Sequence, residues 1–310
     1  MDKASRIYVA GHRGLVGSAI CRKLIDEGCN NLITRTHDEL DLCDQVTVNQ
    51  FFKEERPEYV FLAAAVVGGI HVNNSQPVRF LRDNLLIQTN VIESAYKYGV
   101  KKLAFLGSTC IYPRDCSQPI KEEYLLTGAL EETNQWYAIA KISGIKLSQA
   151  YQKEYGFNAI SLMPTNLYGP HDNFDLQNSH VLPALIRKFH EGKEKNAKTV
   201  EVWGSGKPYR EFLYIDDMAD ACCFLMQNYD DESIINIGTG EDISIKELAE
   251  LIRDVVGFQG DISFDSSKPD GTPKKLTDVT KLNNLGWKSQ TSLKEGLEKT
   301  YQWYVNNKYN

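Results

Sequence analysis

RIYVAGHRGLVG, residues 6–17, begins with an apolar run that predicts a short buried strand and ends in a turn with glycines at positions 11, 14 and 17. Residues 18–27 then show the apolar spacing of an amphipathic helix. Glycines let a backbone turn tightly and approach a pyrophosphate, which lies against the N-terminus of the following helix. Because strand, glycine turn and helix follow in this order, the stretch favours a dinucleotide-binding unit over a plain tight turn.

Basic side chains after the second predicted strand, residues 31–34, bear on the type of dinucleotide. An NAD-binding unit usually has an acid near this point, on the ribose 2′-hydroxyl. This chain has Arg35 and His37 instead, and Arg13 lies inside the glycine turn. Three basic groups indicate a 2′-phosphate and therefore NADP(H), whereas the acidic pair at residues 38–39 points toward NAD.

Further apolar runs, at residues 59–65, 103–106 and 159–163, predict strands, and helical patterns separate them. The run at 59–65 is continuously apolar, which is typical of a strand covered on both faces. This alternation predicts an α/β fold with a doubly wound parallel (Rossmann) sheet over residues 1–165. The pattern changes afterwards, so we expect residues 166–310 to form mainly a smaller substrate-binding domain, with a return to the first domain around 211–240.

Tyr137 and Lys141 are the strongest catalytic candidates from the residues alone. Their spacing places them on one helix face, one turn apart, and a neighbouring cation lowers the pKa of a phenol. The same spacing occurs at Tyr98 and Lys102, but only Tyr137 follows a predicted strand that ends near a serine, Ser108. A serine at the carboxyl edge of a parallel sheet can hydrogen-bond the same substrate oxygen as the tyrosine. The three residues therefore predict proton transfer to or from an alcohol oxygen.

The composition excludes several other classes of protein. The chain has 310 residues and a net charge of −6, which disfavours a nucleic-acid surface, and its longest apolar run, residues 59–67, is far shorter than a membrane span. Seven cysteines without a C-x-x-C pair, and six scattered histidines, predict neither a disulfide framework nor a metal site. These features, with a predicted strand directly after the first few residues, indicate a cytoplasmic protein without a signal peptide.

Motifs spread along nearly the whole chain resemble the extended short-chain dehydrogenase/reductase family, which acts on nucleotide sugars. They are Gly11-x-x-Gly14-x-x-Gly17, Ser108, Tyr137-x-x-x-Lys141, Arg210-x-Phe212-x-x-x-x-Asp217 and Asn236-x-Gly238. Longer stretches, including residues 110–113, 164–174, 178–180 and 268–273, are similar to members that use NADPH on GDP-4-keto-6-deoxy-D-mannose. Those members epimerise C3 and C5 of the sugar and reduce C4.

The resemblance implies a role for each matching residue. Tyr137 would donate the proton at C4, Lys141 would hold the nicotinamide ribose, and Ser108 would orient the carbonyl. Cys110 and His180 would be the base and the acid of epimerisation. The implied GDP-sugar contacts are Lys188, Trp203, Arg210 and Asp270. The implied NADP(H) contacts are Gly11, His12, Arg13, Gly14, Leu15, Val16, Gly17, Arg35, His37, Asp41, Leu42, Ala63, Ala65, Leu106, Gly107, Ser108, Thr109, Tyr137, Lys141, Pro164, Thr165, Asn166, Leu167 and His180. Many members have a second arginine where this chain has His37.

The implied epimerisation is chemically reasonable for these residues. Protons at C3 and C5 flank the C4 ketone, so removing either one gives an enolate. A thiolate and an imidazole on opposite faces of the sugar can remove and return such a proton. The simpler alternatives are that Cys110 is a small buried apolar residue and that His180 only caps a helix.

Two other functions fit the same sequence. The first is reduction at C4 of a related GDP-4-keto sugar, such as a heptose, without epimerisation. The second is a non-catalytic NADP(H) sensor, against which the intact Ser108, Tyr137 and Lys141 argue. The family also commonly forms homodimers through a four-helix bundle. The helices predicted at 84–98 and 137–151 would supply it, although core burial also explains the apolar faces of the first.

Overall fold

The first predicted strand and its glycine turn form as expected in the computed structural model, which describes residues 1–176, 178–268 and 270–307. Strand β1 (Ile7–Ala10) leads into helix α1 (Leu15–Asp26). The helix begins earlier than predicted, because Gly14 is its N-cap and Gly17 lies within its first turn. Gln177 and Pro269, which belong to two of the predicted loops, lie outside the described residues.

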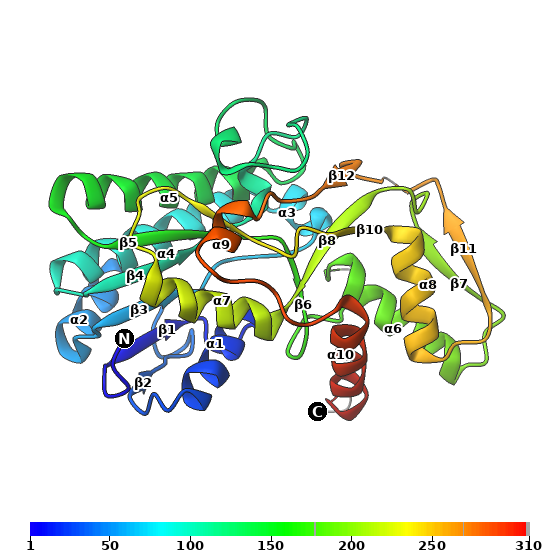
Figure 1. Cartoon of the computed structure of the whole chain (residues 1–310), viewed down its shortest axis with the longest axis horizontal. Helices are drawn as coiled ribbons and strands as arrows, with labels where there is room; N and C mark the ends of the chain where they lie inside the picture. The colour runs from blue at the N-terminus through cyan, green and yellow to red at the C-terminus, as the bar shows by residue number, and fades with distance from the viewer. Residues whose placement is uncertain (177, 269, 308–310) are drawn as a thin grey trace.

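A parallel six-stranded sheet with the order β2-β1-β3-β4-β5-β9 confirms the predicted Rossmann fold (Figure 1). Its other strands are β2 (Leu32–Ile33), β3 (Tyr59–Leu62), β4 (Lys102–Leu106), β5 (Ala159–Pro164) and β9 (Ile235–Ile237). The strand order reverses between β1 and β3. In open α/β sheets, ligands bind beyond the carboxyl ends of the strands at such a point.

Side chains of the sheet alternate between two apolar cores. Ile7 and Val9 of β1 pack in one cluster with α1 and α7 (Ile215–Asn228), whereas Tyr8 and Ala10 belong to the cluster on the other face. That second cluster includes residues of α2 (Gln45–Glu55), α4 (Pro77–Lys97) and α5 (Gln135–Tyr155). The central strands are therefore covered on both faces, which explains their continuous apolar runs.

The remaining elements lie mainly beyond the carboxyl ends of these strands, on the right in Figure 1. Strands β10, β8 and β12 form a second sheet, in which β6 also pairs with β8, and β11 pairs with β7. The strands are β6 (Asn166–Tyr168), β7 (Thr199–Trp203), β8 (Tyr209–Tyr214), β10 (Asp242–Ser244), β11 (Asp261–Asp265) and β12 (Lys274–Lys275). The helices are α3 (Ile70–Ser75), α6 (Val181–Glu194), α8 (Ile245–Val256), α9 (Thr280–Asn284) and α10 (Leu293–Asn307), with short 3₁₀ turns η1 (Thr109–Ile111) and η2 (Glu122–Tyr124).

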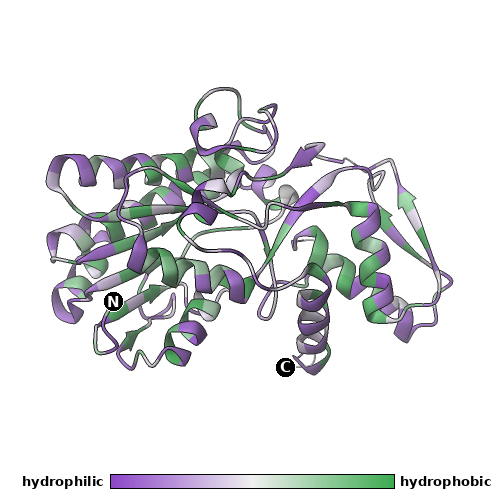
Figure 2. Ribbon diagram, viewed as in Figure 1, coloured by the Kyte–Doolittle hydropathy of each residue, from purple (hydrophilic) through white to green (hydrophobic). Residues whose placement is uncertain are grey.

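The apolar cluster beneath α1 and α7 continues into this second part of the molecule. It includes Leu182 and Phe189 of α6 and Leu248 and Ile252 of α8, together with Ile160 of the large sheet. Figure 2 shows the hydrophobic colour concentrated in the strands and on the inner sides of the helices. No helix of the described residues is both long and apolar enough to cross a membrane. The division of the chain into two domains near residue 165 stays a prediction.

Helices α4 and α5 pack closely because a glycine lies between them. A Cβ atom at Gly144 would lie 2.4 Å from Cζ of Phe105 and 2.6 Å from Oε1 of Gln88. Both of those side chains are buried, and Gln88 is also held by a 2.6 Å hydrogen bond to the carbonyl of Ala140. Neither side chain can move away freely. The α5 helix that carries Tyr137 and Lys141 is thereby fixed against the sheet.

We expect Gly144→Ala to destabilise the protein by about 1–3 kcal/mol, as overpacking of a core typically does. The sign of the change in the free energy of unfolding is informative, because replacing glycine by alanine in a helix interior otherwise stabilises a protein by ~1 kcal/mol. Lys146→Ala, at an exposed position of the same helix, is the control and should change stability by less than ~0.5 kcal/mol. Urea unfolding measures both variants, and a Gly144→Ala protein as stable as the wild type would contradict the packing argument.

Candidate active site

The glycine turn lies directly against the end of β3. Gly11 has a φ of +82°, and a Cβ atom there would lie 2.9 Å from the carbonyl oxygen of Ala63. At Gly17 a Cβ atom would lie 2.2 Å from the carbonyl oxygen of Gly11. The backbone therefore occupies space that any side chain would fill, and the N-terminus of α1 faces the turn. Free amides and the positive end of a helix suit a pyrophosphate, so this region fits the predicted dinucleotide.

Arg13 and Arg35 come close to one carboxylate, Glu39. Hydrogen bonds from the backbone N–H and the hydroxyl of Thr36 lower the pKa of Glu39, and the charges of Arg35 and Arg13 lower it further. Arg35 also forms an ion pair with Glu55. The structure thus brings together the two arginines that the sequence assigned to a 2′-phosphate. Glu39 lies beside them as a carboxylate, so it competes for these positive charges.

The other residues predicted near the adenosine part lie around the same edge of the sheet. His37 is mostly exposed, and its Nδ1 lies 3.9 Å from Oδ1 of Asp41. Leu42 is buried, and its carbonyl accepts a hydrogen bond of 3.0 Å from Asn90 of α4. Ala63 continues β3, because its N–H donates to the carbonyl of Ala10 at 3.1 Å.

Ser108 and Cys110 lie in a tight turn at the end of β4. The backbone at Gly107 passes so close to Met163 that a Cβ atom would lie 2.2 Å from Cε of the methionine. The N–H of Cys110 donates to Oγ of Ser108 at 3.3 Å, which orients the serine hydroxyl. An oxygen that accepts this bond can still donate its own hydrogen to a substrate oxygen. Thr109, between them, is buried.

Lys141 reaches back from α5 to the end of the same strand. Its ammonium nitrogen donates to the carbonyl of Leu106 at 2.7 Å and lies 5.6 Å from the ring centroid of Tyr137. Burial lowers the pKa of Lys141 to about 8, so the group remains largely charged at neutral pH. The predicted triad of Ser108, Tyr137 and Lys141 therefore converges on one place.

The expectation that Lys141 lowers the pKa of Tyr137 is wrong for this structure. The ring is half-buried, and burial raises the pKa of the phenol above its usual value, with Cys110 raising it further. Desolvation is the largest cause of the shift. The ammonium nitrogen of Lys141 lies over the ring face and donates to the carbonyl of Leu106. Tyr137 is consequently held in its protonated form at neutral pH, which is the form that donates a proton.

The segment after β5 connects the two parts of the molecule. Thr165 donates from its N–H to the carbonyl of Ile237 at 2.9 Å, and the side chain of Asn166 donates to the carbonyl of Glu211 at 2.8 Å. Pro164 ends β5 and Leu167 lies in β6. These predicted cofactor residues thus lie at the same carboxyl edge as Gly11, Ala63 and Ser108.

Cys110 and His180 approach the site from different elements. Cys110 is 8% exposed, and burial raises the pKa of its thiol, which hydrogen bonding to Ser108 and the charges of Lys275 and Lys141 oppose. His180 is the N-cap residue of α6 but makes no side-chain cap hydrogen bond. Although His180 is an exposed residue, desolvation of its imidazole by the surrounding protein lowers its pKa, and the charge of Lys275 lowers it further.

The loop that carries His180 is attached to the loop after β3. The N–H of Gly69 donates to the carbonyl of Asn178 at 3.3 Å. A Cβ atom at Gly69 would lie 3.3 Å from the carbonyl oxygen of Ser179, so the two loops are in close contact. This contact holds His180 on the side of the site that faces the second part of the molecule.

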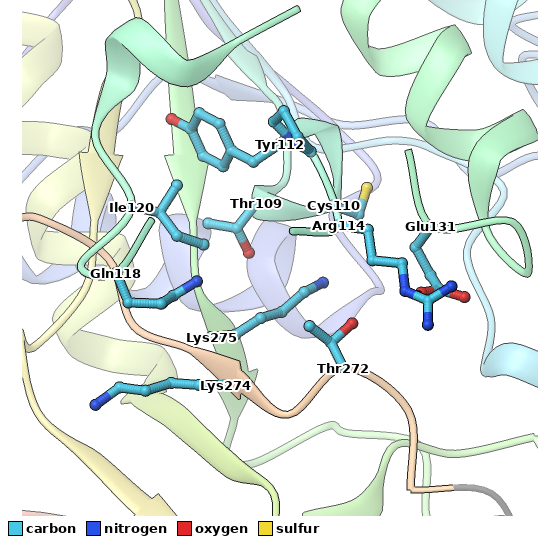
Figure 3. A pocket seen from close by; sticks show the side chains of 11 residues that line it. Thr109, Cys110, Tyr112, Arg114, Gln118, Ile120, Glu131, Thr272, Lys274 and Lys275 are labelled. Carbon is cyan, nitrogen blue, oxygen red and sulfur yellow. The ribbon is translucent and has the colours of Figure 1, made fainter. Parts of the chain in front are cut away.

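Lys275 is a site residue that the sequence interpretation missed. It lines a small pocket together with Thr109, Cys110, Arg114, Glu131 and Thr272 (Figure 3). The stretch that carries the family resemblance ends at Pro273, two residues before Lys275. The available signal was the lysine pair at 274–275 in an extended segment, because adjacent strand residues point to opposite faces.

The four predicted GDP-sugar residues form two contacting groups. Lys188 has its ammonium nitrogen 4.9 Å from the ring centroid of Trp203, which is 54% exposed. Asp270 accepts hydrogen bonds from the N–H and hydroxyl of Ser205, two residues after Trp203. These bonds lower the pKa of Asp270, and the nearby charge of Arg210 also lowers it. An exposed ring flanked by cations is suited to a purine base and its phosphates.

The described residues contain no group of three or more histidine, cysteine or acidic side chains that could hold a metal ion. All seven cysteines are free thiols.

A family model described as the NAD dependent epimerase/dehydratase family matches residues 7–238. This chain belongs to that family. The family description implies a dinucleotide, and the glycine turn that would hold it lies at the same carboxyl edge of the sheet as Ser108.

Two relatives with high sequence identity to this chain are GDP-L-fucose synthases. The chain is 60% identical over 306 residues to GDP-L-fucose synthase 1 of Arabidopsis thaliana, covering 99% of this chain and 95% of the relative. It is 53% identical over 311 residues to the GDP-L-fucose synthase of Escherichia coli K12, covering 97% of each chain.

Solved structures of family members superpose closely. A GDP-6-OMe-4-keto-L-xylo-heptose reductase from C. jejuni has a TM-score of 0.94 at 41% identity, over 99% of both chains. A GDP-L-fucose synthetase from Naegleria fowleri bound to NADP has a TM-score of 0.92 at 33% identity, over 100% of this chain and 97% of the other.

We expect Arg13→Ala to weaken NADPH binding by about tenfold or more and to change NADH binding little. The lost interaction is a charge-assisted contact with the 2′-phosphate, and such contacts are typically worth ~1.5–3 kcal/mol. Arg253→Ala, at an arginine paired with Asp254 on α8, is the control and should leave both affinities unchanged. Fluorescence titration measures them, and equal losses for the two cofactors in Arg13→Ala would remove the 2′-phosphate assignment.

Proposed function

We propose that this protein converts GDP-4-keto-6-deoxy-D-mannose to GDP-L-fucose with NADPH, by epimerisation at C3 and C5 followed by reduction at C4. The observation that supports it most is the 60% and 53% identity to GDP-L-fucose synthases over nearly the full chain. The convergence of Ser108, Tyr137 and Lys141 beside Cys110 supplies the chemistry that this conversion needs. A cytoplasmic location remains a prediction from the sequence.

Reduction requires a hydride at C4 and a proton at the C4 oxygen. The glycine turn and the two arginines would hold NADPH, which would supply the hydride when bound. Tyr137 is protonated at neutral pH, as any phenol with an ordinary or a raised pKa is, and it donates the proton. Ser108 donates a hydrogen bond to the same oxygen, and the positive charge of Lys141 stabilises the phenolate that remains.

Epimerisation requires a base and an acid beside C3 and C5. In this proposal the thiolate of Cys110 removes the proton, and the electron pair moves toward the C4 oxygen to give an enolate. The hydrogen-bond donors Ser108 and Tyr137 stabilise that oxygen, so one pair of residues serves both reactions. His180 then returns a proton to the opposite face of the ring.

Reduction at C4 without epimerisation is the second candidate function. It is favoured by the TM-score of 0.94 with a GDP-heptose reductase, although that protein is only 41% identical to this chain. The synthases are more similar in sequence, so we propose the synthase reaction first.

Turnover of GDP-4-keto-6-deoxy-D-mannose in D₂O separates the two functions. Wild-type protein with NADPH should give product that carries deuterium at C3 and C5, because each carbon loses its proton and regains one from a group that exchanges with solvent. Cys110→Ser should block this incorporation and still allow some reduction at C4. Product NMR measures the label. A wild-type product without deuterium at either carbon would mean that the protein only reduces C4 and does not epimerise the sugar.

Tyr137→Phe is the matched variant for the reduction at C4. It removes only the transferable proton, so it should keep NADPH binding and label incorporation while turnover falls by ~10²–10⁴-fold. Near wild-type reduction by this variant would end the assignment of Tyr137 as proton donor.

We also propose that the protein forms a homodimer through α4 and α5. These helices pack against each other and expose apolar side chains, namely Val78 and Leu86 on α4 and Trp136 and Ile139 on α5. A second copy that packs the same two helices against this face would bury them in a four-helix bundle, with two-fold symmetry.

Light scattering at micromolar concentration should give twice the chain mass of 35.1 kDa. Ile139→Glu should lower the measured mass toward the monomer, because it would bury a charge in the interface. Val305→Glu, at a residue of α10 with the same 38% exposure, is the control and should leave the dimer intact. A wild-type monomer would refute the interface.

A further inference from the structure

The position of Lys275 is firmly determined by backbone pairing. Strand β12 runs parallel to β8, with Lys274 opposite Tyr209 and Lys275 opposite Arg210. The next residue is also held, because the N–H of Leu276 donates to Oε1 of Gln118 at 2.8 Å. The side chain of Lys275 therefore starts from a rigid strand.

The two lysines of β12 have different surroundings. Lys274 forms an ion pair of 3.1 Å with Asp242 and lies over the ring of Tyr209. Lys275 extends to the other side, into the pocket lined by Thr109 and Cys110, and in Figure 3 its ammonium end lies below these two residues. Within the described residues, Lys275 makes no ion pair with a carboxylate. Lys275 is half-buried, and the surrounding protein desolvates its ammonium group, which lowers its pKa. A desolvated cation without a carboxylate partner is unfavourable for stability, which points to a functional reason for it.

Lys275 belongs to the side of the site that would carry out epimerisation. It shares the pocket with Cys110, and its charge acts on both Cys110 and His180. By contrast, the charge that acts on both Tyr137 and Lys141 is that of Cys110. The lysine is thus coupled to the two residues that the proposed function assigns to proton exchange at carbon.

We propose that Lys275 is a positioning residue for epimerisation, which holds the proton released by the thiol of Cys110 and stabilises the resulting thiolate. This inference rests on the proposed function. Transfer of the proton breaks the S–H bond of Cys110 and forms an N–H bond on the Lys275 amine, giving a thiolate and an ammonium. The thiolate then takes the proton from C3 or C5.

The direction of each pKa shift agrees with this exchange. Burial raises the pKa of Cys110 and lowers that of Lys275, so the neutral thiol and amine are favoured when each group is considered alone. Each group opposes the shift of the other, because opposite charges stabilise each other. The ammonium form also lowers the pKa of His180, which makes its imidazolium a stronger acid.

Other charged groups face the pair and are part of its environment. Lys141 and the Ser108 hydroxyl lower the pKa of Cys110 from the α5 and β4 sides. Arg210 lowers the pKa of Lys275, whereas Glu131 and Cys116 raise it. The Nε atom of Arg114 lies 3.4 Å from Oε2 of Glu131, so this arginine compensates part of the charge of the Glu131 carboxylate. Lys275 is therefore not the only cation near the thiol, and its contribution has to be measured by substitution.

Alkylation of Cys110 by iodoacetamide, followed by peptide mass spectrometry as a function of pH, measures the thiolate directly. The experiment uses the full chain without sugar, so its outcome does not depend on whether the protein epimerises anything. Lys275→Met should lower the alkylation rate of Cys110 at pH 7 by about tenfold or more, which corresponds to a rise of one pKa unit. Lys275→Arg should retain most of the rate, because it keeps the positive charge.

Lys274→Met is the matched control. Lys274 also lines the pocket, but its side chain extends away from Cys110 and forms an ion pair with Asp242, so the variant should leave the alkylation profile unchanged. Urea unfolding and NADPH binding verify that each variant is folded, and Lys275→Gln replaces the methionine variant if that one is not. With sugar present, Lys275→Met should reduce deuterium incorporation at C3 and C5 by about tenfold. A purely phosphate-binding lysine would instead raise KM for the GDP-sugar.

An unchanged pH profile of Cys110 alkylation in a folded Lys275→Met or Lys275→Gln protein would overturn the proposal. A wild-type product without deuterium at C3 and C5 would overturn the proposed epimerisation. It would not affect the alkylation result. The two inferences can therefore fail separately.

Discussion

The buried carboxylate of Glu211 holds together the segments that build the site. It is fully buried and accepts hydrogen bonds from the N–H and hydroxyl of Thr277 at 2.8 and 2.6 Å, and from the N–H groups of Thr239 and Gly240 at 2.7 and 2.8 Å. Thr277 follows β12 and Thr239 follows β9 of the large sheet. One side chain of β8 thus joins both sheets.

Several motif residues therefore serve to connect segments, and a ligand is not needed to explain them. A Cβ atom at Gly238 would lie 2.2 Å from Oε1 of Glu211, so the glycine of the Asn236-x-Gly238 motif leaves room for the carboxylate. Asn236 donates to the carbonyl of Ile120 at 2.9 Å. Asp217 accepts from the N–H groups of Gln290 and Thr291 at 3.0 and 2.8 Å. Arg210 and Lys275 lie opposite each other on the paired strands β8 and β12, and the bonds of Glu211 to Thr277 lie next to this pairing.

Sequence patterns were sufficient where local order determines structure, as in the glycine turn, the parallel sheet and the helix that carries Tyr137 and Lys141. They were insufficient where tertiary contacts decide. Helix α4 begins at Pro77, because proline suits a first helical position, although the apolar spacing was clear only from residue 84. The pKa of Tyr137 rises because burial outweighs its neighbouring lysine, and one-dimensional spacing contains no information on burial. Lys275 was not predicted as a site residue, because a two-residue strand is too short to show an alternating pattern of side chains.

The apolar cluster that runs from the large sheet into α6 and α8 bears on how a sugar nucleotide enters. Separating the two parts as rigid bodies would expose this cluster to water, at ~25 cal/mol for each Å² of apolar surface. Hinge opening between the parts is consequently unfavourable. A sugar nucleotide therefore has to reach the site without separation of the two parts. The serine after β4 and the tyrosine and lysine of α5 thereby keep their positions relative to the segments that hold the substrate.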